Sequence, residues 1–268
     1  MRQLSAFREA GRVRGVFCDI DDTLTTDGRL TALAYAAMER LRAAGKLVVP
    51  ITGRPAGWCD HIARLWPVDA VVGENGGFYF CYDAAARRLV RRFPDDEPTR
   101  AANRARLKAV RDRILREVPG SAVACDQPFR ETGLAIDFCE EVPRLSEAAI
   151  GRIVAIMEAS GLTATLGSTR VNGRFGHTDA LGMTRTLMQE QFGVDLDQPG
   201  ARADYAFVGA SPGDAAMFAF FPHSVGVANV RDFLERMPDQ PKYITSARCG
   251  AGFAELAEMI IREGASNP

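Results

Sequence analysis

The strongest structural signal in this chain is an apolar segment that runs directly into acidic residues, VRGVFCDIDDT at residues 13–23. Its first part, Val13 to Asp19, is rich in β-branched and aromatic side chains, which is typical of a buried parallel strand. Asp19 and Asp21 then stand two residues apart at the carboxyl end of that strand. Open α/β sheets bind ligands at this edge, so the segment predicts a site there. An acidic loop that caps the next helix would give the same pattern, because Asp and Thr are good N-cap residues.

Strands and helices alternate on both sides of an interruption in the middle of the chain. This alternation is typical of a parallel α/β sheet, and it holds up to residue 77 and again after residue 175. We therefore predict an α/β fold with a Rossmann-like parallel-sheet core, residues 1–80 and 175–268, and an inserted α/β cap, residues 81–174. The predicted elements are helices over 30–44, 98–118, 146–159, 179–192 and 213–221, a helix ending at 65, a hairpin over 78–90, and strands over 13–19, 47–51, 70–73, 134–138, 162–166, 205–209 and 225–228.

The composition excludes several classes of partner. Charges nearly cancel, with 33 basic and 34 acidic residues, so there is no electrostatic reason to expect binding to nucleic acid or to a membrane surface. The six cysteines are scattered, with no C-x-x-C pair, which argues against a zinc site. The chain has no apolar stretch of about 18 residues and no apolar signal segment at its start. These features predict a soluble, cytoplasmic protein and carry no information on its oligomeric state.

Two more strand ends carry groups that suit an anion. The segment Ile51-Thr52-Gly53-Arg54 offers a hydroxyl and main-chain N–H groups. The loop GASPGD, residues 209–214, follows another apolar strand and carries one carboxylate, Asp214. Each segment alone is compatible with an ordinary βα turn. Three such strand ends, in this order and flanking an insertion, favour one shared site.

The loop Glu74-Asn75-Gly76-Gly77 lies where the chain enters the predicted cap. Its glycines suit a hinge and its polar side chains suit a ligand contact, although a plain tight turn has the same composition. We therefore take Glu74 and Asn75, together with Thr52, Gly53 and Arg54, as candidate substrate-binding residues.

These strand-end motifs and the inserted cap resemble the haloacid dehalogenase superfamily, in its branch with a large α/β cap between the second and third motifs. The resemblance extends over nearly the whole chain, and residues 51–80 and 129–176 are similar to mannosyl-3-phosphoglycerate and sucrose-phosphate phosphatases. It implies hydrolysis of a small phosphorylated metabolite, such as a sugar phosphate, in a site between the core and the cap.

The resemblance also implies a role for each motif residue. Asp19 matches the nucleophile that attacks phosphorus to give an aspartyl-phosphate, and Asp21 matches the acid/base that protonates the leaving oxygen. Thr52 matches the hydroxyl that orients the phosphoryl group. Such enzymes hold Mg²⁺ through the nucleophile's carboxylate, the main-chain carbonyl at the acid/base position and a fourth-motif carboxylate. The candidate metal ligands are therefore Asp19, Asp21 and Asp214.

Two positions depart from the family pattern. Ala210 replaces the fourth-motif aspartate that ligates the metal, which leaves Asp214 as the carboxylate of that loop. Ala180 replaces the third-motif lysine, and the chain's three lysines, Lys46, Lys108 and Lys242, lie far from it in sequence. Loss of one preorganised charge-stabilising group typically costs about 100- to 1,000-fold in turnover. Two such losses predict reduced catalysis and weak or absent Mg²⁺ binding.

Other side chains offer partial substitutes for the lysine. Arg174 or Arg185 could bring a guanidinium group from nearby, although its planar fork is not equivalent to an ammonium group. His177, beside the altered third motif, could act as a base or a cation near neutral pH, or it could be a surface histidine at the cap junction.

Three functions stay open from the sequence. The first is a phosphohydrolase of reduced activity that holds Mg²⁺ weakly through Asp19, Asp214 and water. The second is a catalytically inactive relative that binds a metabolite or a protein partner. The third is metal-independent chemistry in which Asp19 attacks a non-phosphate substrate. Asp21 argues against a halide leaving group, which needs no proton, and suits a leaving oxygen.

Overall fold

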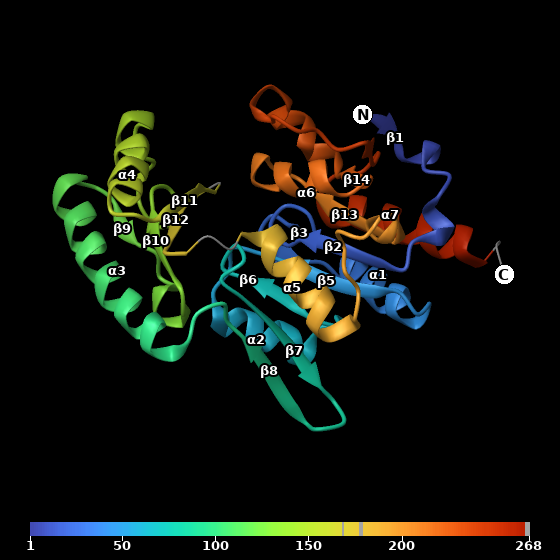
Figure 1. Cartoon of the computed structure of the whole chain (residues 1–268). Coiled ribbons are helices and arrows are strands. Elements are labelled where there is room, and N and C mark those ends of the chain that lie inside the picture. The colour runs from blue at the N-terminus through green and yellow to red at the C-terminus, as the bar shows by residue number, and fades with distance from the viewer. Residues whose placement is uncertain (168, 177–178, 266–268) are drawn as a thin grey trace.

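The chain forms a large and a small α/β unit in the computed structural model, which describes residues 1–167, 169–176 and 179–265. Figure 1 shows the small unit, which contains α3 (Glu97–Glu117) and α4 (Glu147–Ala159), beside the large one. The amino-terminal and carboxyl-terminal segments both belong to the large unit, so the small unit is an insertion into it.

Among those described residues, nine strands form the sheet of the large unit, in the order β1-β15-β14-β13-β2-β5-β6-β7-β8. The first seven strands in this spatial order pair in parallel. The last two, β7 and β8, continue the sheet in the antiparallel direction. The parallel part confirms the predicted fold class. The strand bounds are β1 (Arg2–Gln3), β2 (Gly15–Asp19), β5 (Leu47–Ile51), β6 (Val71–Gly73), β7 (Phe78–Asp83), β8 (Arg88–Arg92), β13 (Tyr205–Gly209), β14 (His223–Gly226) and β15 (Tyr243–Ile244).

Helices cover both faces of this sheet (Figure 1). On one face lie α1 (Ala32–Ala43), α2 (Ala56–Leu65) and α7 (Cys249–Ala265), and on the other lie α5 (Ala180–Phe192) and α6 (Ala215–Phe220). The central strand β2 contacts both layers, because Val16 and Cys18 join one apolar core and Phe17 joins the other. A strand buried on both faces needs a continuous apolar sequence, which β2 has. The shorter elements are the strands β3 (Thr25–Thr26) and β4 (Arg29–Leu30) and the 3₁₀ helices Leu4–Ala6, Ala10–Arg12, Gln127–Phe129, Ala201–Asp204, Pro212–Asp214 and Ala228–Arg236.

The small unit, residues 97–174, is called the cap below. Four of its described strands form an antiparallel sheet in the order β11 (Thr163–Leu166), β12 (Arg170–Arg174), β10 (Gly133–Asp137) and β9 (Ala122–Val123). Leu134, Ile136 and Val171 of this sheet pack against apolar residues of α3 and α4. The opposite face of the sheet is therefore left for polar side chains, and it lies toward the large unit (Figure 1).

The predicted start of the cap, residue 81, falls inside β7. This strand pairs with β6 and β8, so the hairpin extends the large sheet instead of beginning the cap sheet. Its side chains alternate accordingly: Phe78 and Phe80 join one core of the large unit and Tyr79 joins the other. The cap's own apolar core begins with residues of α3.

Within the described ranges, none of the helices combines the length and the apolar character that crossing a bilayer requires.

Candidate active site

The three predicted strand ends meet at one edge of the large sheet. The strand β2 lies between β13 and β5, and its last residue, Asp19, pairs in register with Ile51. Thr52 follows directly after β5, and the loop from Ala210 to Asp214 follows directly after β13. Parallel neighbours end at the same edge, so the motif residues of all three segments lie side by side.

The loop after Asp19 is folded tightly around one carbonyl group. The main-chain N–H groups of Thr23, Leu24 and Thr25 all donate to the Ile20 oxygen, at 3.0 to 3.3 Å. Asp22 takes a left-handed conformation with φ of 59°, which Asp tolerates better than most residues. The buried Thr23 hydroxyl donates to Asp19 Oδ2 at 3.3 Å. These contacts fix the direction of the Asp19 carboxylate.

The Asp19 carboxylate lies in a strongly anionic environment. Burial raises the pKa of Asp19 well above its usual range, and the charges of Asp214 and Asp21 raise it further. The main-chain N–H of Ile20 and the hydroxyl of Thr23 act in the opposite direction without reversing the shift. The ionised form of Asp19 therefore needs positive charge from a ligand or an ion to be stable here.

Asp214 is held by its own loop. Its Oδ2 atom accepts hydrogen bonds from the N–H groups of Ala210 at 3.0 Å and Ser211 at 2.9 Å, and from the Ser211 hydroxyl at 3.1 Å. Burial raises the pKa of Asp214, although these donors favour its ionised form. The Ala210 side chain is almost fully buried, at 1% exposure. The loop therefore holds one carboxylate whose charge acts on Asp19, and Ala210 contributes only a methyl group.

A Mg²⁺ ion has two side-chain carboxylates available in this site, those of Asp19 and Asp214. In the part of the chain that the structure describes, no three His, Cys, Asp or Glu side chains gather as a metal site. Buried carboxylates of like charge are nevertheless stabilised by a cation. Because Mg²⁺ commonly keeps several water ligands, two carboxylates suit a hydrated ion better than an ion held by protein ligands alone.

The Asp21 side chain forms a bidentate ion pair with Arg54. Arg54 donates from Nη2 to Oδ1 at 2.7 Å and from Nε to Oδ2 at 3.0 Å. The guanidinium also lies over the Trp58 ring, 4.6 Å from its centroid. Burial lowers the pKa of Arg54, but the hydrogen bonds and charge of Asp21 outweigh it and raise that pKa overall. Arg54 is a predicted substrate-binding residue, and the structure shows its guanidinium bonded to Asp21, the predicted acid/base.

Thr52 is buried at 2% exposure at the end of β5. Its Oγ1 atom accepts a hydrogen bond from the Arg54 N–H at 3.1 Å, which leaves the hydroxyl hydrogen available to a ligand. The Gly53 carbonyl accepts a hydrogen bond from Arg130 Nη1 of the cap at 3.0 Å. The loop therefore touches the cap as well as the predicted catalytic residues.

Glu74 joins the large unit to the cap. Its carboxylate accepts hydrogen bonds from the main-chain N–H groups of Glu131, Thr132 and Gly133 and from the Thr132 hydroxyl, at 2.6 to 2.9 Å. The N–H of Ala56, at the start of α2, is a further donor at 3.1 Å. Both Glu74 oxygen atoms are therefore occupied by protein donors, and this carboxylate positions the cap.

Asn75 lies beside the Gly53 loop. Glu74 and Asn75 both adopt positive φ, at 47° and 55°, followed by Gly76 at 93°. Glycine is required at residue 76, because a Cβ there would lie 2.2 Å from the Asp179 carbonyl at the start of α5. The loop thus connects β6, the cap and the helix that begins with Ala180.

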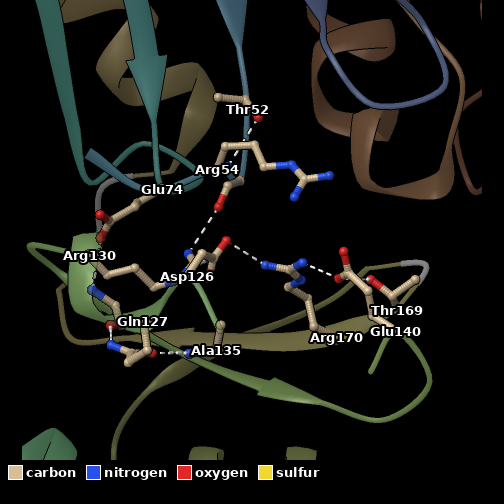
Figure 2. A network of polar contacts seen from close by, with 12 residues as sticks. Thr52, Arg54, Glu74, Asp126, Gln127, Arg130, Ala135, Glu140, Thr169 and Arg170 are labelled. Carbon is tan, nitrogen blue, oxygen red and sulfur yellow. Dashed lines mark hydrogen bonds and ion pairs between the residues drawn. The ribbon is translucent and has the colours of Figure 1, made fainter. Parts of the chain in front are cut away.

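A polar network on the cap faces this edge, and sequence reasoning missed it (Figure 2). The buried Asp126 accepts hydrogen bonds from Arg130 at 3.1 Å and from Arg170 at 2.6 Å, and Arg170 also pairs with Glu140. The i, i+4 spacing of Asp126 and Arg130 was an available signal, but nothing local identified Arg170 as their partner.

The proposed substitutes for the lysine lie in different places. Arg185 pairs with Asp197 at 2.9 Å and its side chain is 40% exposed, so it is engaged at the surface. Arg174 is buried in the cap, where Asp179, Glu74 and Asp95 are the charges that act on it. His177 lies outside the described residues.

The fold is similar to that of solved haloacid dehalogenase-like hydrolases. Among solved structures, Thermoplasma acidophilum 0175 matches with a TM-score of 0.70 at 15% identity, over 92% of this chain and 98% of that chain. A haloacid dehalogenase-like hydrolase from Bacteroides thetaiotaomicron matches with a TM-score of 0.65 at 14% identity, over 92% and 99%. The sucrose-phosphatase from Synechocystis sp. PCC6803, solved with sucrose and phosphate, matches with a TM-score of 0.62 at 14% identity, over 97% and 98%. No protein-family model and no curated protein matches the chain.

Proposed function

We propose that this protein is a phosphohydrolase that acts on a small phosphorylated metabolite, such as a sugar phosphate, through an aspartyl-phosphate on Asp19. The observation that carries the proposal is the meeting of Asp19, Thr52 and Asp214 at adjacent strand ends, with Asp21 two residues beyond the nucleophile. The names of the structural matches, which include a sucrose-phosphatase, support a phosphorylated sugar as the first substrate class to test.

In the first step, a carboxylate oxygen of Asp19 bonds to phosphorus while the bond from phosphorus to the leaving oxygen breaks. Asp21 gives that oxygen a proton, and Thr52 donates a hydrogen bond to the phosphoryl group. In the second step, Asp21 takes a proton from water, whose oxygen bonds to phosphorus as the bond to Asp19 breaks. Arg54 keeps Asp21 in one orientation through both steps.

Asp19, Asp214 and the main-chain carbonyl of Asp21 would hold a Mg²⁺ ion, which supplies positive charge next to the phosphoryl oxygens. Ala180 and Ala210 remove a cation and a metal ligand from the pattern that the resemblance implies. Since each such loss typically costs about 100- to 1,000-fold, we propose a turnover far below that of an intact site.

The test is phosphate release from an aryl phosphate and a panel of sugar phosphates, with Mg²⁺ or with a chelator. We expect slow release that Mg²⁺ stimulates and that Asp19→Asn abolishes. Asp22→Asn is the matched control, because Asp22 is exposed and Asn tolerates its positive φ. Equal release by the wild-type protein and Asp19→Asn would refute the proposal.

A protein that binds without turnover is the second candidate, and the two alanines at 180 and 210 favour it. In that case no substrate is hydrolysed, but a metabolite from the panel raises the melting temperature. Activity that is independent of Mg²⁺ but still requires Asp19 would instead favour attack by Asp19 on a non-phosphate substrate.

A further inference from the structure

Three buried arginines lie in the described part of the cap, and they differ in how their charges are balanced. Arg130 pairs with Asp126, and Arg170 pairs with both Asp126 and Glu140. Arg174 is as deeply buried, at 7% exposure. Yet no described residue, across 1–167, 169–176 and 179–265, forms an ion pair or a hydrogen bond with its guanidinium group.

Nearby carboxylates do not neutralise Arg174 directly. Asp179, Glu74 and Asp95 act on it only through space, while burial lowers the pKa of Arg174. The Glu74 oxygens are taken by the cap hydrogen bonds described above, and Asp179 Oδ1 accepts the Gly182 N–H at 2.7 Å. A buried charge without a bonded partner is costly, so the site favours a ligand that supplies one.

Arg174 belongs to a polar row on the open face of the cap sheet. Arg170, Asn172 and Arg174 alternate along β12 with Val171 and Gly173, which face the helices. A strand that is apolar on one face therefore presents three polar side chains on the other.

The neighbouring strands leave space beside this row. Arg174 pairs in register with Thr163 on one side and Gly133 on the other. Asn172 pairs with Thr165 and Ala135. Beside Asn172 and Arg174, the sheet thus carries hydroxyl groups on β11 and residues with little or no side chain on β10.

A small hollow lies between this face and the loop of Glu74 and Asn75. It measures about 10 Å³, and its lining includes Arg174, Asn172 and Thr163. This is the room of about one water molecule. Asn172 Oδ1 is buried there, and no described atom partners it. Thr163 is exposed on the edge strand β11, so the hollow lies next to solvent.

We infer that this hollow is a binding site for a small oxyanion that also carries a hydroxyl group, such as hydrogen phosphate or a hydroxy acid. The planar fork of Arg174 matches two oxygens of a carboxylate or phosphate. The ligand's O–H group donates a hydrogen bond to Asn172 Oδ1, so this buried oxygen also gains a partner. Since an oxyanion is larger than one water, Arg174 or the exposed edge strand shifts when it binds.

The inference does not rest on turnover, so its test uses Asp19→Ala protein, which lacks the proposed nucleophile. Inorganic phosphate is added at constant ionic strength with chloride as the reference anion, and the melting temperature is recorded. We expect phosphate to stabilise the Asp19→Ala protein and its Arg152→Met derivative equally. Arg152 is the matched control, because it pairs with Glu117 on the cap surface and its side chain is 53% exposed.

The Arg174→Met derivative should lose the phosphate response. It should also melt at a higher temperature than its parent without phosphate, because a buried unpaired charge has been removed. An equal phosphate response in this derivative, or no response in the Asp19→Ala parent, would overturn the inference. If the Arg174→Met variant does not fold, Arg174→Lys is used in its place. A phosphate-induced rise in melting temperature equal to that of the Asp19→Ala parent would then refute the inference.

A second comparison identifies the source of the oxyanion. If it is part of the substrate, Arg174→Met in otherwise active protein raises KM for a phosphorylated hydroxy acid and leaves KM for a neutral sugar monophosphate unchanged. If it is a separate anion, both KM values respond alike to added phosphate. Both outcomes are consistent with an oxyanion site at Arg174 and differ only in what supplies the oxyanion. Of the two tests, only this KM comparison rests on the proposed phosphohydrolase activity.

Discussion

Replacing Glu74 by alanine should loosen the joint between the large unit and the cap. The carboxylate is 2% exposed, and every donor that it binds from the described residues would lose its acceptor. Those hydrogen bonds come from the N–H groups of Ala56 (3.1 Å), Glu131 (2.9 Å), Thr132 (2.8 Å) and Gly133 (2.9 Å) and from the Thr132 hydroxyl (2.6 Å).

The size of the effect follows from these contacts. A hydrogen bond to a charged group contributes about 1.5–3 kcal/mol, but bonds that share one carboxylate are not additive. Each buried donor left without an acceptor costs about 1–3 kcal/mol, so for the group of donors together we expect Glu74→Ala to lose about 3–5 kcal/mol of unfolding free energy. At about 2–4 °C per kcal/mol for a protein of this size, the melting temperature should fall by roughly 6–20 °C.

Urea unfolding measures the loss, and hydrogen exchange locates it. The amides of Glu131, Thr132 and Gly133 should exchange faster in Glu74→Ala. Glu258→Ala is the control, because Glu258 forms a surface pair with Arg40 at 55% exposure and should change stability by less than about 0.5 kcal/mol. A loss below about 1 kcal/mol in Glu74→Ala, with unchanged exchange, would refute the role of Glu74 as the joint.

Three further predictions follow from the active-site edge. Burial and the neighbouring carboxylates raise the pKa of Asp19, so the folded protein binds its proton more tightly than the unfolded chain does. Stability is therefore lost as pH rises above the unfolded value of about 4, and in chelator Asp19→Asn should raise the melting temperature at pH 8 and not at pH 4 or below. Ala180→Lys combined with Ala210→Asp should raise Mg²⁺-dependent turnover by about 100-fold or more, whereas the uncharged pair Ala180→Gln and Ala210→Asn should not. Arg54→Lys should lower unfolding free energy by about 1 kcal/mol in urea, because lysine cannot form the two-pronged bond to the partly exposed Asp21; no loss would contradict that bond.

The buried parallel strands were predictable because their sequences are continuous apolar runs. The predicted bounds of strands 47–51 and 205–209 match β5 and β13. The predicted start of the helix over 146–159 also holds, because Ser146 caps α4 by accepting the Ala149 N–H. Local chemistry determines these elements, so the sequence alone reveals them.

Elements that depend on close or long-range packing were missed. No helix is predicted over α7, because its first turns contain Gly250 and Gly252, and glycine usually weakens a helix. A Cβ at Gly250 would lie 2.7 Å from the Leu24 carbonyl oxygen, and a Cβ at Gly252 would lie 2.5 Å from that of Ala247. Both distances are too short for any other residue, so tertiary packing requires glycine at these positions. The strand β12 was missed because Arg170, Asn172 and Arg174 make it polar on one face.

The candidate site also has a part that the local sequence predicts and a part that depends on long-range contacts. Its motif residues were found because each follows an apolar strand, and their proximity follows from the parallel sheet. The partners of Glu74 and Arg170 lie on other elements, 57 to 59 residues away for the cap donors of Glu74 and 44 and 30 residues away for the acceptors of Arg170. No local pattern encodes such contacts.

Trapping the covalent intermediate tests the role of Asp19 most directly. The protein is mixed with an aryl phosphate and Mg²⁺, quenched in acid, digested and examined by mass spectrometry. We predict one added phosphoryl group on Asp19 in the wild-type protein and in Asp22→Asn, and none in Asp19→Asn. Phosphate release without a phosphoryl group on Asp19, or with that group on another residue, would contradict Asp19 as the nucleophile.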